Sequence, residues 1–220
     1  KQEGINGQVT FNGNPLGNIG MVLIQCPTQG ECGDIPQTRV ASTRTDAGGF
    51  YAFTNVPTLP ADSYYQVIYQ NGQEGGNATN DLYLFQWFSN RITSYTAGQS
   101  LNVPIIDVSD LLPVRPVDNP SLGLPITLEW QKRSIADALQ ERYGWFLFDE
   151  QSGALYCINP ADGFTSGTTS ILTQNYFEQN CGGQYERGRA WAPVVLDQES
   201  GIGLGYSNGR CTASRAGGPT

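Results

Sequence analysis

The sequence predicts an all-β protein made of two antiparallel β-sandwiches in tandem, joined by a proline-rich linker. The chain has 220 residues with 27 glycines, 13 prolines and many aromatics, a composition typical of short strands separated by turns. Apolar and polar residues alternate with a period of two in many short segments. Prolines recur between residues 112 and 125 without an apolar period. This linker, expected to be a semi-rigid spacer, separates domains 1–111 and 126–220, each near the usual domain size.

The first domain opens with strands joined by strong turn signals. Ile5–Phe11 alternates as a strand, Asn12–Pro15 forms a turn, and Ile19–Gln25 is the second strand. A turn that begins at Asp46 contains two glycines, which readily adopt the left-handed backbone of a tight turn. It leads into the alternating strand Phe50–Phe53, so a hairpin entering a half-buried strand is expected here.

Three further strands complete the first domain. Tyr64–Tyr69 alternates as a strand, and Ser100–Val108 closes the domain, with Pro104 typical of a sheet edge. The segment Asp81–Phe88 is apolar on both faces, so it is either buried twice or presents one face to a partner. The aromatic residues on one side of this segment are Tyr83, Phe85 and Trp87.

Two stretches resemble the carboxypeptidase regulatory-like, or prealbumin-like, modules of secreted and cell-surface proteins. Thr45–Pro57 follows the pattern T-D-x-x-G-x-Y/F-x-F-x-x-V/L-P. Gly7–Leu23, with its Asn-Gly and Pro-Leu pairs, matches the opening of the same modules. The resemblance implies that domain 1–111 is a sandwich that positions and binds and that has no general catalytic site.

The second domain resembles fibronectin type III modules. Leu128-Glu129-Trp130 matches the tryptophan motif of the second strand, and Tyr185 is a candidate for the tyrosine corner. The two resemblances together imply that both domains are Ig-like β-sandwiches. A serine N-cap predicts a short helix from Ser134. The expected strands are Ile126–Trp130, Tyr143–Phe148, Ala154–Ile158, Ser170–Thr173 and Arg189–Leu196, with a final hairpin in Gly201–Ser214.

The five cysteines predict an oxidising, extracellular compartment and at least one disulfide. Cys26 and Cys32 bracket a short loop, which favours a local disulfide. In the strand order implied by the fibronectin resemblance, the sixth strand begins beside the end of the seventh, which favours a pairing of Cys181 with Cys211. Cys157 is then the odd cysteine, either a free buried thiol or the site of an intermolecular bond.

Composition excludes several classes of function. The chain has no histidine, which rules out Ser-His-Asp and Cys-His catalysis and histidine zinc sites. A net charge of −8 argues against nucleic acid and anionic membrane surfaces as partners. No apolar run approaches the roughly 20 residues of a membrane span. Because the first residue is Lys1, we expect a mature, processed form.

The sequence gives the acidic residues structural or solvated roles rather than catalytic or metal-binding ones. Asp149-Glu150 is the closest carboxylate pair, but it lies in a predicted turn, where solvated charges are expected. Asp46 could bind calcium only beside Asp107 or Asp110, and the sequence has no D-x-D-x-D-G loop. We therefore expect no enzyme, no metal and no cofactor.

These observations favour a non-enzymatic, secreted structural protein: a surface, adhesion or pilus-like fibre subunit that assembles head to tail with copies of itself. The alternative is a carbohydrate-binding module that uses Tyr83, Trp87 or Trp191 as stacking platforms. The aromatic face of Tyr83, Phe85 and Trp87 also fits the packed side of an edge strand. Asn77-Ala78-Thr79 predicts an N-glycosylation acceptor at Asn77.

Overall fold

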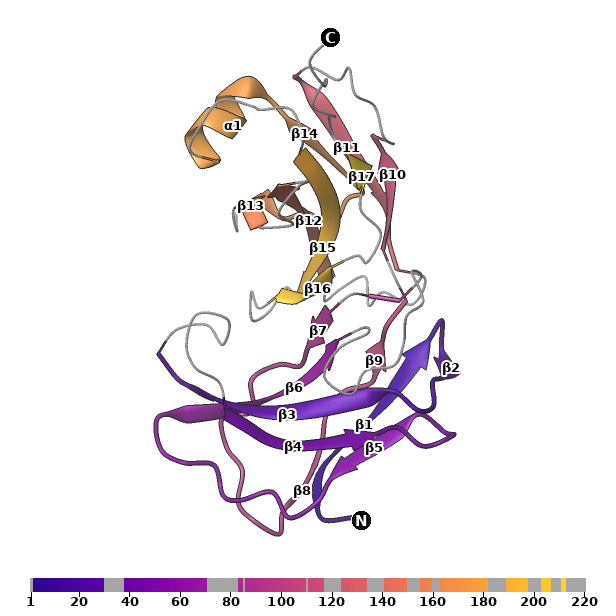
Figure 1. Cartoon of the computed structure of the whole chain (residues 1–220), viewed down its shortest axis with the longest axis vertical. Helices are drawn as coiled ribbons and strands as arrows, with labels where there is room; N and C mark the ends of the chain where they lie inside the picture. Colours follow the sequence, from indigo (N-terminus) through magenta and orange to yellow (C-terminus); the bar gives the residue numbers. More distant parts are fainter. Residues whose placement is uncertain are drawn as a thin grey trace. The chain divides into compact units, whose positions relative to one another are not determined.

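The computed structural model divides the chain into two compact units, Lys1–Ser109 and Asp110–Thr220. The prediction of an all-β protein is confirmed, because the structure contains β-strands and one short α-helix (Figure 1). It describes residues 2–29, 38–70, 83–84, 86–109, 111–116, 124–133, 141–149, 155–159, 163–181, 189–197, 203–206 and 211–212. Among these residues, no helix is long and apolar enough to cross a membrane.

The first sheet of the first unit is built around β1 (Gly4–Phe11). Strands β5 (Phe50–Phe53) and β2 (Asn14–Pro15) pair with it in antiparallel fashion. Strands β8 (Ser100–Asn102) and β9 (Ile106–Asp107) run parallel to it. The expected single strand Ser100–Val108 is therefore two short strands, interrupted around Pro104, whose backbone has no N–H to donate to a ladder.

The second sheet of this unit has the order β7 (Gln86–Phe88), β6 (Ser63–Gln70), β3 (Gly20–Pro27) and β4 (Thr38–Arg44), all antiparallel. Alternate residues of β3 and β6 are fully buried and form the core with Ile5, Val9 and Phe53 of the first sheet. The opposite face of β3 is also buried, because Val22 and Ile24 pack there with Tyr64. The inner faces of the two sheets enclose the sandwich core.

A buried carboxylate ties the ends of this sandwich together. Asp107 on β9 is 5% exposed and accepts hydrogen bonds from the hydroxyl of Thr10 at 2.8 Å and the backbone N–H of Gly13 at 3.1 Å. Its other oxygen accepts from the backbone N–H of Ser109 at 3.0 Å and from the Ser109 hydroxyl. These bonds fix the β1–β2 hairpin against the last strand of the unit.

The second unit is also a two-sheet sandwich. One sheet has the order β10 (Leu112–Arg115), β11 (Ile126–Gln131) and β14 (Thr169–Leu172). The other contains β13 (Leu155–Ile158), β12 (Glu141–Asp149), β15 (Arg189–Asp197) and β16 (Gly203–Tyr206), and β17 (Cys211–Thr212) also pairs with β15. The first, second and fifth strands share one sheet, an arrangement typical of Ig-like sandwiches. Trp130, Trp145 and Trp191 fill the core.

Two features of the second unit differ from the expectation. Leu112–Arg115, at the start of the predicted semi-rigid linker, forms β10 and pairs with β11, so this part of the linker is a strand. Helix α1 (Gln174–Asn180) was not predicted; the hydroxyl of Thr173 caps it by accepting from the N–H of Tyr176. The helix predicted from Ser134 lies outside the described residues.

Candidate functional site

Cys157 on β13 and Cys181 at the end of α1 form a disulfide, with Cα atoms 5.3 Å apart. The predicted pairing of Cys181 with Cys211 is therefore wrong, and Cys157 is not the odd cysteine. The prediction placed Cys181 at the start of a strand, whereas α1 ends there and brings its thiol to β13 instead. Cys26 is also disulfide-bonded, and its predicted partner Cys32 lies outside the described residues.

The two tryptophans proposed as stacking platforms are core residues. Trp87 is 7% exposed and Trp191 is fully buried, with its indole N–H donating to the carbonyl of Pro116 at 3.4 Å. Tyr83 is half-buried and its ring packs 5.0 Å from that of Phe11. These tryptophans offer no surface to a sugar or a subunit. Phe85 and Asn77 lie outside the described residues.

Several carboxylates are engaged in structural bonds. One oxygen of Asp46 accepts from the N–H groups of Gly48 at 2.8 Å and Phe50 at 3.0 Å, which is the turn chemistry expected from the sequence. Glu141 is buried in an ion pair with Arg133, and the hydroxyl of Tyr143 donates to it at 2.8 Å. Burial, followed by the charge of Glu141, raises the pKa of Tyr143 well above its usual range.

Strand β13 presents apolar side chains at a sheet edge. A bulge in its pairing with β12 places Leu155 beside Phe148 and Ile158 beside Phe146. Both therefore lie on the same face of the sheet, where Phe146 packs against the buried Phe148. Leu155 is 54% and Ile158 49% exposed. Within the described part of the chain, β13 pairs with β12 only, so it is the end strand of its sheet.

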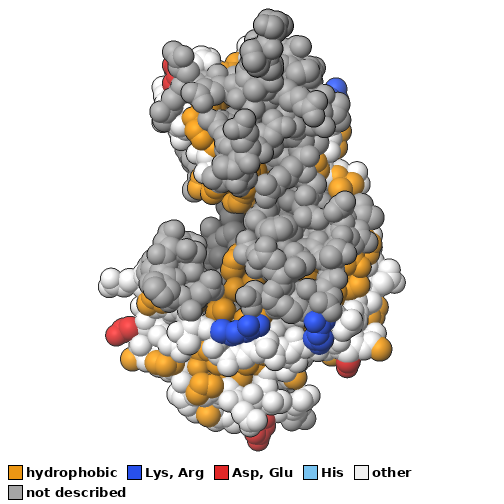
Figure 2. Space-filling view, viewed as in Figure 1, with side chains coloured by type: hydrophobic (Ala, Val, Ile, Leu, Met, Phe, Trp, Pro, Cys, Tyr) orange, Lys and Arg blue, Asp and Glu red, His pale blue; other side chains and the backbone are white. Residues whose placement is uncertain are grey.

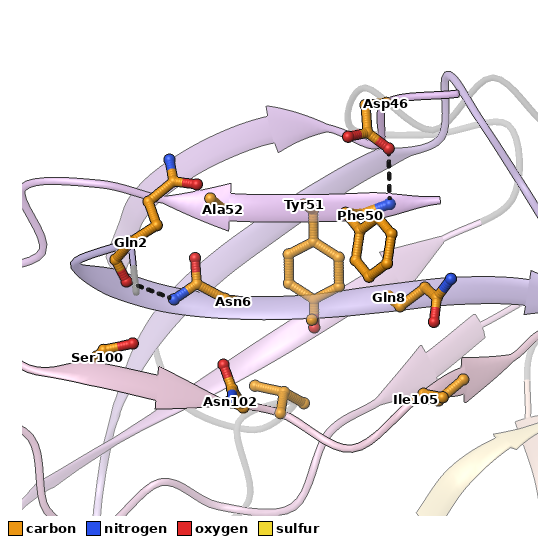
Figure 3. Close-up of a pocket in the computed structure, with 12 residues that line it drawn as sticks. Gln2, Asn6, Gln8, Asp46, Phe50, Tyr51, Ala52, Ser100, Asn102 and Ile105 are labelled. Atoms are coloured by element: carbon orange, nitrogen blue, oxygen red, sulfur yellow. Dashed lines mark hydrogen bonds between the residues drawn. The ribbon is translucent and has the colours of Figure 1, made fainter. Parts of the chain in front are cut away.

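A groove of about 510 Å³ lies on the outer face of the first sheet in the first unit. Cross-strand pairing defines its floor, because Phe50 is opposite Gln8, and Asn6 lies between Ala52 and Asn102. Paired residues point to the same side of a sheet, so these side chains share one surface. Figure 3 shows them coming from three neighbouring strands, with Ser100, Ile105, Asp46 and Gln2 around them.

Hydrogen bonds hold two amides of this groove in place. The Asn6 side-chain NH₂ donates to the carbonyls of Gln2 at 3.1 Å and Gly4 at 3.0 Å. The Gln8 NH₂ donates to the carbonyl of Gly48 at 2.9 Å. These bonds use the amide nitrogens and leave both amide oxygens without a hydrogen bond among the described residues. The groove therefore presents fixed acceptors.

A buried tyrosine supports the groove from the core side. Tyr51 is paired with Gly7, and its phenol lies beneath that glycine, where an added Cβ would sit 2.3 Å from the hydroxyl oxygen. Tyr51 is 3% exposed, and its hydroxyl has no hydrogen-bond partner among the described residues. Burial raises its pKa well above the usual range. Its role is thus packing under the groove floor.

Sequence reasoning missed this groove because it depends on which strands lie side by side. The polar residues of β1 and the exposed Phe50 are visible as alternation, but nothing local shows that β8 lies beside β1. Phe50 could have indicated a binding surface, because it is a large aromatic residue on the exposed side of its strand. Among the side chains that Figure 2 draws in colour, those on the first unit include few charges on the visible face.

No protein-family model matches the sequence, and no curated protein does either. Among solved structures, a variant of shaft pilin SpaA from Lactobacillus rhamnosus GG aligns with a TM-score of 0.30 and 9% identity, over 98% of this chain and 95% of that chain. A second structure of this pilin gives 0.29 and 10%, with the same coverage. The FN1-FN3 domains of chicken CNTN1 give 0.27 and 11%, over 96% and 63%. These scores are too low to transfer any property to this chain.

Proposed function

We propose that this chain is a non-enzymatic extracellular structural protein, a surface, adhesion or pilus-like fibre subunit. The observation that carries the compartment is a disulfide-bonded cysteine in each unit, Cys26 in the first and Cys157 with Cys181 in the second. Disulfides persist in oxidising compartments and are rare in the cytosol. The two units are proposed to be a prealbumin-like sandwich followed by a fibronectin type III-like sandwich, and the two antiparallel sheets of the second unit support this proposal.

The non-enzymatic part of the proposal is supported by the absence of histidine from the sequence and by the structural bonds of three of its acidic residues. Asp46 is engaged in a turn, Asp107 in a hydrogen-bond network and Glu141 in a buried ion pair. A catalytic carboxylate must reach a substrate with a partner group beside it. Asp107 and Glu141 are instead buried and bonded to neighbouring protein groups.

Self-assembly is proposed to use the outer edge of β13. Among the described strands, β13 is the end strand of its sheet, and it exposes Leu155 and Ile158 on one face. Strand addition at such an edge supplies main-chain hydrogen bonds, while apolar side chains bury area against the neighbouring copy. A contact between this edge and a different surface of the next copy generates a filament when the rotation between copies does not close into a ring.

The test combines light scattering after size-exclusion chromatography with negative-stain microscopy of the native material. The wild-type chain is expected to form a concentration-dependent ladder of oligomers or ordered fibres. The double variant Leu155→Lys, Ile158→Lys is expected to remain monomeric. The control Ile171→Lys changes a side chain that is 63% exposed on β14, in the other sheet, and is expected to assemble normally. A wild-type chain that stays monomeric at the highest concentration reached would contradict the proposal.

The carbohydrate-binding alternative cannot rest on the tryptophans that first motivated it. Trp87 and Trp191 are buried, so a sugar ring has no access to either of them. A glycan would need another surface with an exposed aromatic ring and fixed polar groups. The outer face of the first sheet has both.

A further inference from the structure

We propose that the groove on the outer face of strands β5, β1 and β8 is a binding site for a neutral saccharide. Its lining combines an exposed aromatic ring with side-chain amides, and it is large enough for a small ligand at about 510 Å³. The proposal does not depend on self-assembly, because the groove and β13 belong to different units.

The hydrogen-bonding groups favour a ligand rich in hydroxyls. The side-chain amides of Asn6 and Gln8 are held in place by the bonds of their NH₂ groups, and their oxygens accept no hydrogen bond among the described residues. Asn6 and Gln8 lie two residues apart on one face of β1, so their Cα atoms are about 7 Å apart. Neighbouring hydroxyls of a sugar can donate to such acceptors. Asn102 lies beside Asn6 across the sheet and makes no side-chain hydrogen bond among the described residues, so it adds a donor and an acceptor.

The aromatic ring provides an apolar surface for the C–H face of a sugar. Phe50 is 56% exposed although its neighbour Tyr51 is buried. The Asp46 carboxylate fixes the backbone of Phe50 at the end of the turn, as Figure 3 shows. Ile105, 62% exposed, adds a second apolar side chain to the lining. An exposed ring in a setting of amides binds an amphipathic ring better than a purely polar or a purely apolar ligand.

The charge of the groove excludes anionic ligands. Among the described residues, its lining includes no lysine or arginine, and Asp46 is the one charged side chain. A phosphate, sulfate or uronic acid would therefore meet a carboxylate without a compensating cation. An extended peptide is also disfavoured, because strand addition needs an open sheet edge and this groove lies on a sheet face. A neutral saccharide carries no charge and needs no open sheet edge, so it fits this groove.

The experiment uses the full chain on a printed array of neutral and acidic oligosaccharides, followed by calorimetric titration with the strongest neutral one. The wild-type chain is expected to bind neutral glycans only. Phe50→Ala is expected to weaken binding about tenfold, and Phe50→Trp to keep it within about threefold. Asn102→Ala, which removes no hydrogen bond within the described structure, is expected to weaken binding about fivefold. Ile171→Ala in the second unit is the matched control and is expected to bind as the wild type does.

The thermal midpoint of each variant is measured alongside, so that a loss of fold is separated from a loss of contacts. Phe50 and Asn102 point away from the core, and their variants are expected to unfold at the wild-type temperature. Binding of acidic glycans alone, or an unchanged affinity in folded Phe50→Ala, would overturn the proposal. So would a wild-type chain that binds no neutral glycan on the array, or one that instead selects peptides from a peptide array.

Discussion

The carboxylate of Asp107 accepts a hydrogen bond of 2.8 Å from the hydroxyl of Thr10, although 97 positions separate these residues in the chain. The bond joins the first and last strands of the first unit inside the protein, since both residues are 5% exposed. Buried polar groups are expensive to leave without partners. The pair is therefore expected to be a main determinant of the stability of this unit.

Replacement of Asp107 by alanine is expected to destabilise the protein by about 3 kcal/mol, because the donors of Thr10, Gly13 and Ser109 lose their shared acceptor. Urea unfolding followed by tryptophan fluorescence measures this loss. Thr10→Val removes one donor only and is expected to cost about 1 kcal/mol. If Asp107→Ala lowered the free energy of unfolding by less than Thr10→Val does, the hydrogen bonds of Asp107 would contribute little to stability.

The Cys157–Cys181 disulfide closes a loop with a sequence separation of 24. Replacing both cysteines by alanine is expected to lower the free energy of unfolding by about 3 kcal/mol, chiefly because the unfolded chain gains freedom. Peptide mapping without reduction is expected to recover Cys157 and Cys181 in one linked fragment. A fragment that links Cys181 to Cys211 would contradict the structure.

Gly7 has no room for a side chain. A Cβ at this position would lie 2.3 Å from the hydroxyl oxygen of Tyr51 and 2.4 Å from its ring. Gly7→Ala is expected to destabilise the first unit by about 2 kcal/mol, because the buried ring must shift within a packed core. Adding Tyr51→Phe removes the closest atom and is expected to restore part of the loss. Equal stability of Gly7→Ala and wild type in urea would contradict this packing.

Tyr51→Phe alone is expected to leave stability at pH 8 unchanged or slightly higher, because the buried hydroxyl has no partner among the described residues. Burial raises the pKa of Tyr51 in the folded protein, so the unfolded chain loses this proton first, near its ordinary value of about 10. The contribution of the neutral Tyr51 to the free energy of unfolding is therefore complete below about pH 10 and is lost as the pH rises further. The free energy of unfolding, measured in urea from pH 8 to 10.5, is expected to fall less steeply with pH for Tyr51→Phe than for the wild type. Equal slopes would contradict a raised pKa of Tyr51.

Much of the fold follows from the sequence by itself. Period-two alternation marks the strands, as in Tyr64–Tyr69, which lies within β6, and Ile126–Trp130, which lies within β11. The turn chemistry of Asp46 is also local, because its side chain bonds to backbone groups two and four residues on. Such features depend on neighbours in the chain, and so they could be predicted. The cysteine content likewise indicated an oxidising compartment before any pairing was known.

Tertiary structure decided which residues meet and which remain at the surface. The aromatic character of Trp87 and Trp191 suited a binding surface equally well, and only the packing of the sheets shows that they are core residues. Cys157 meets Cys181 because α1 intervenes between β14 and β15. The groove exists because β8 pairs in parallel with β1, although the two strands lie near opposite ends of the sequence of the first unit. These contacts join segments far apart in sequence, and their free energy depends on the packing of the whole domain, which no local pattern encodes.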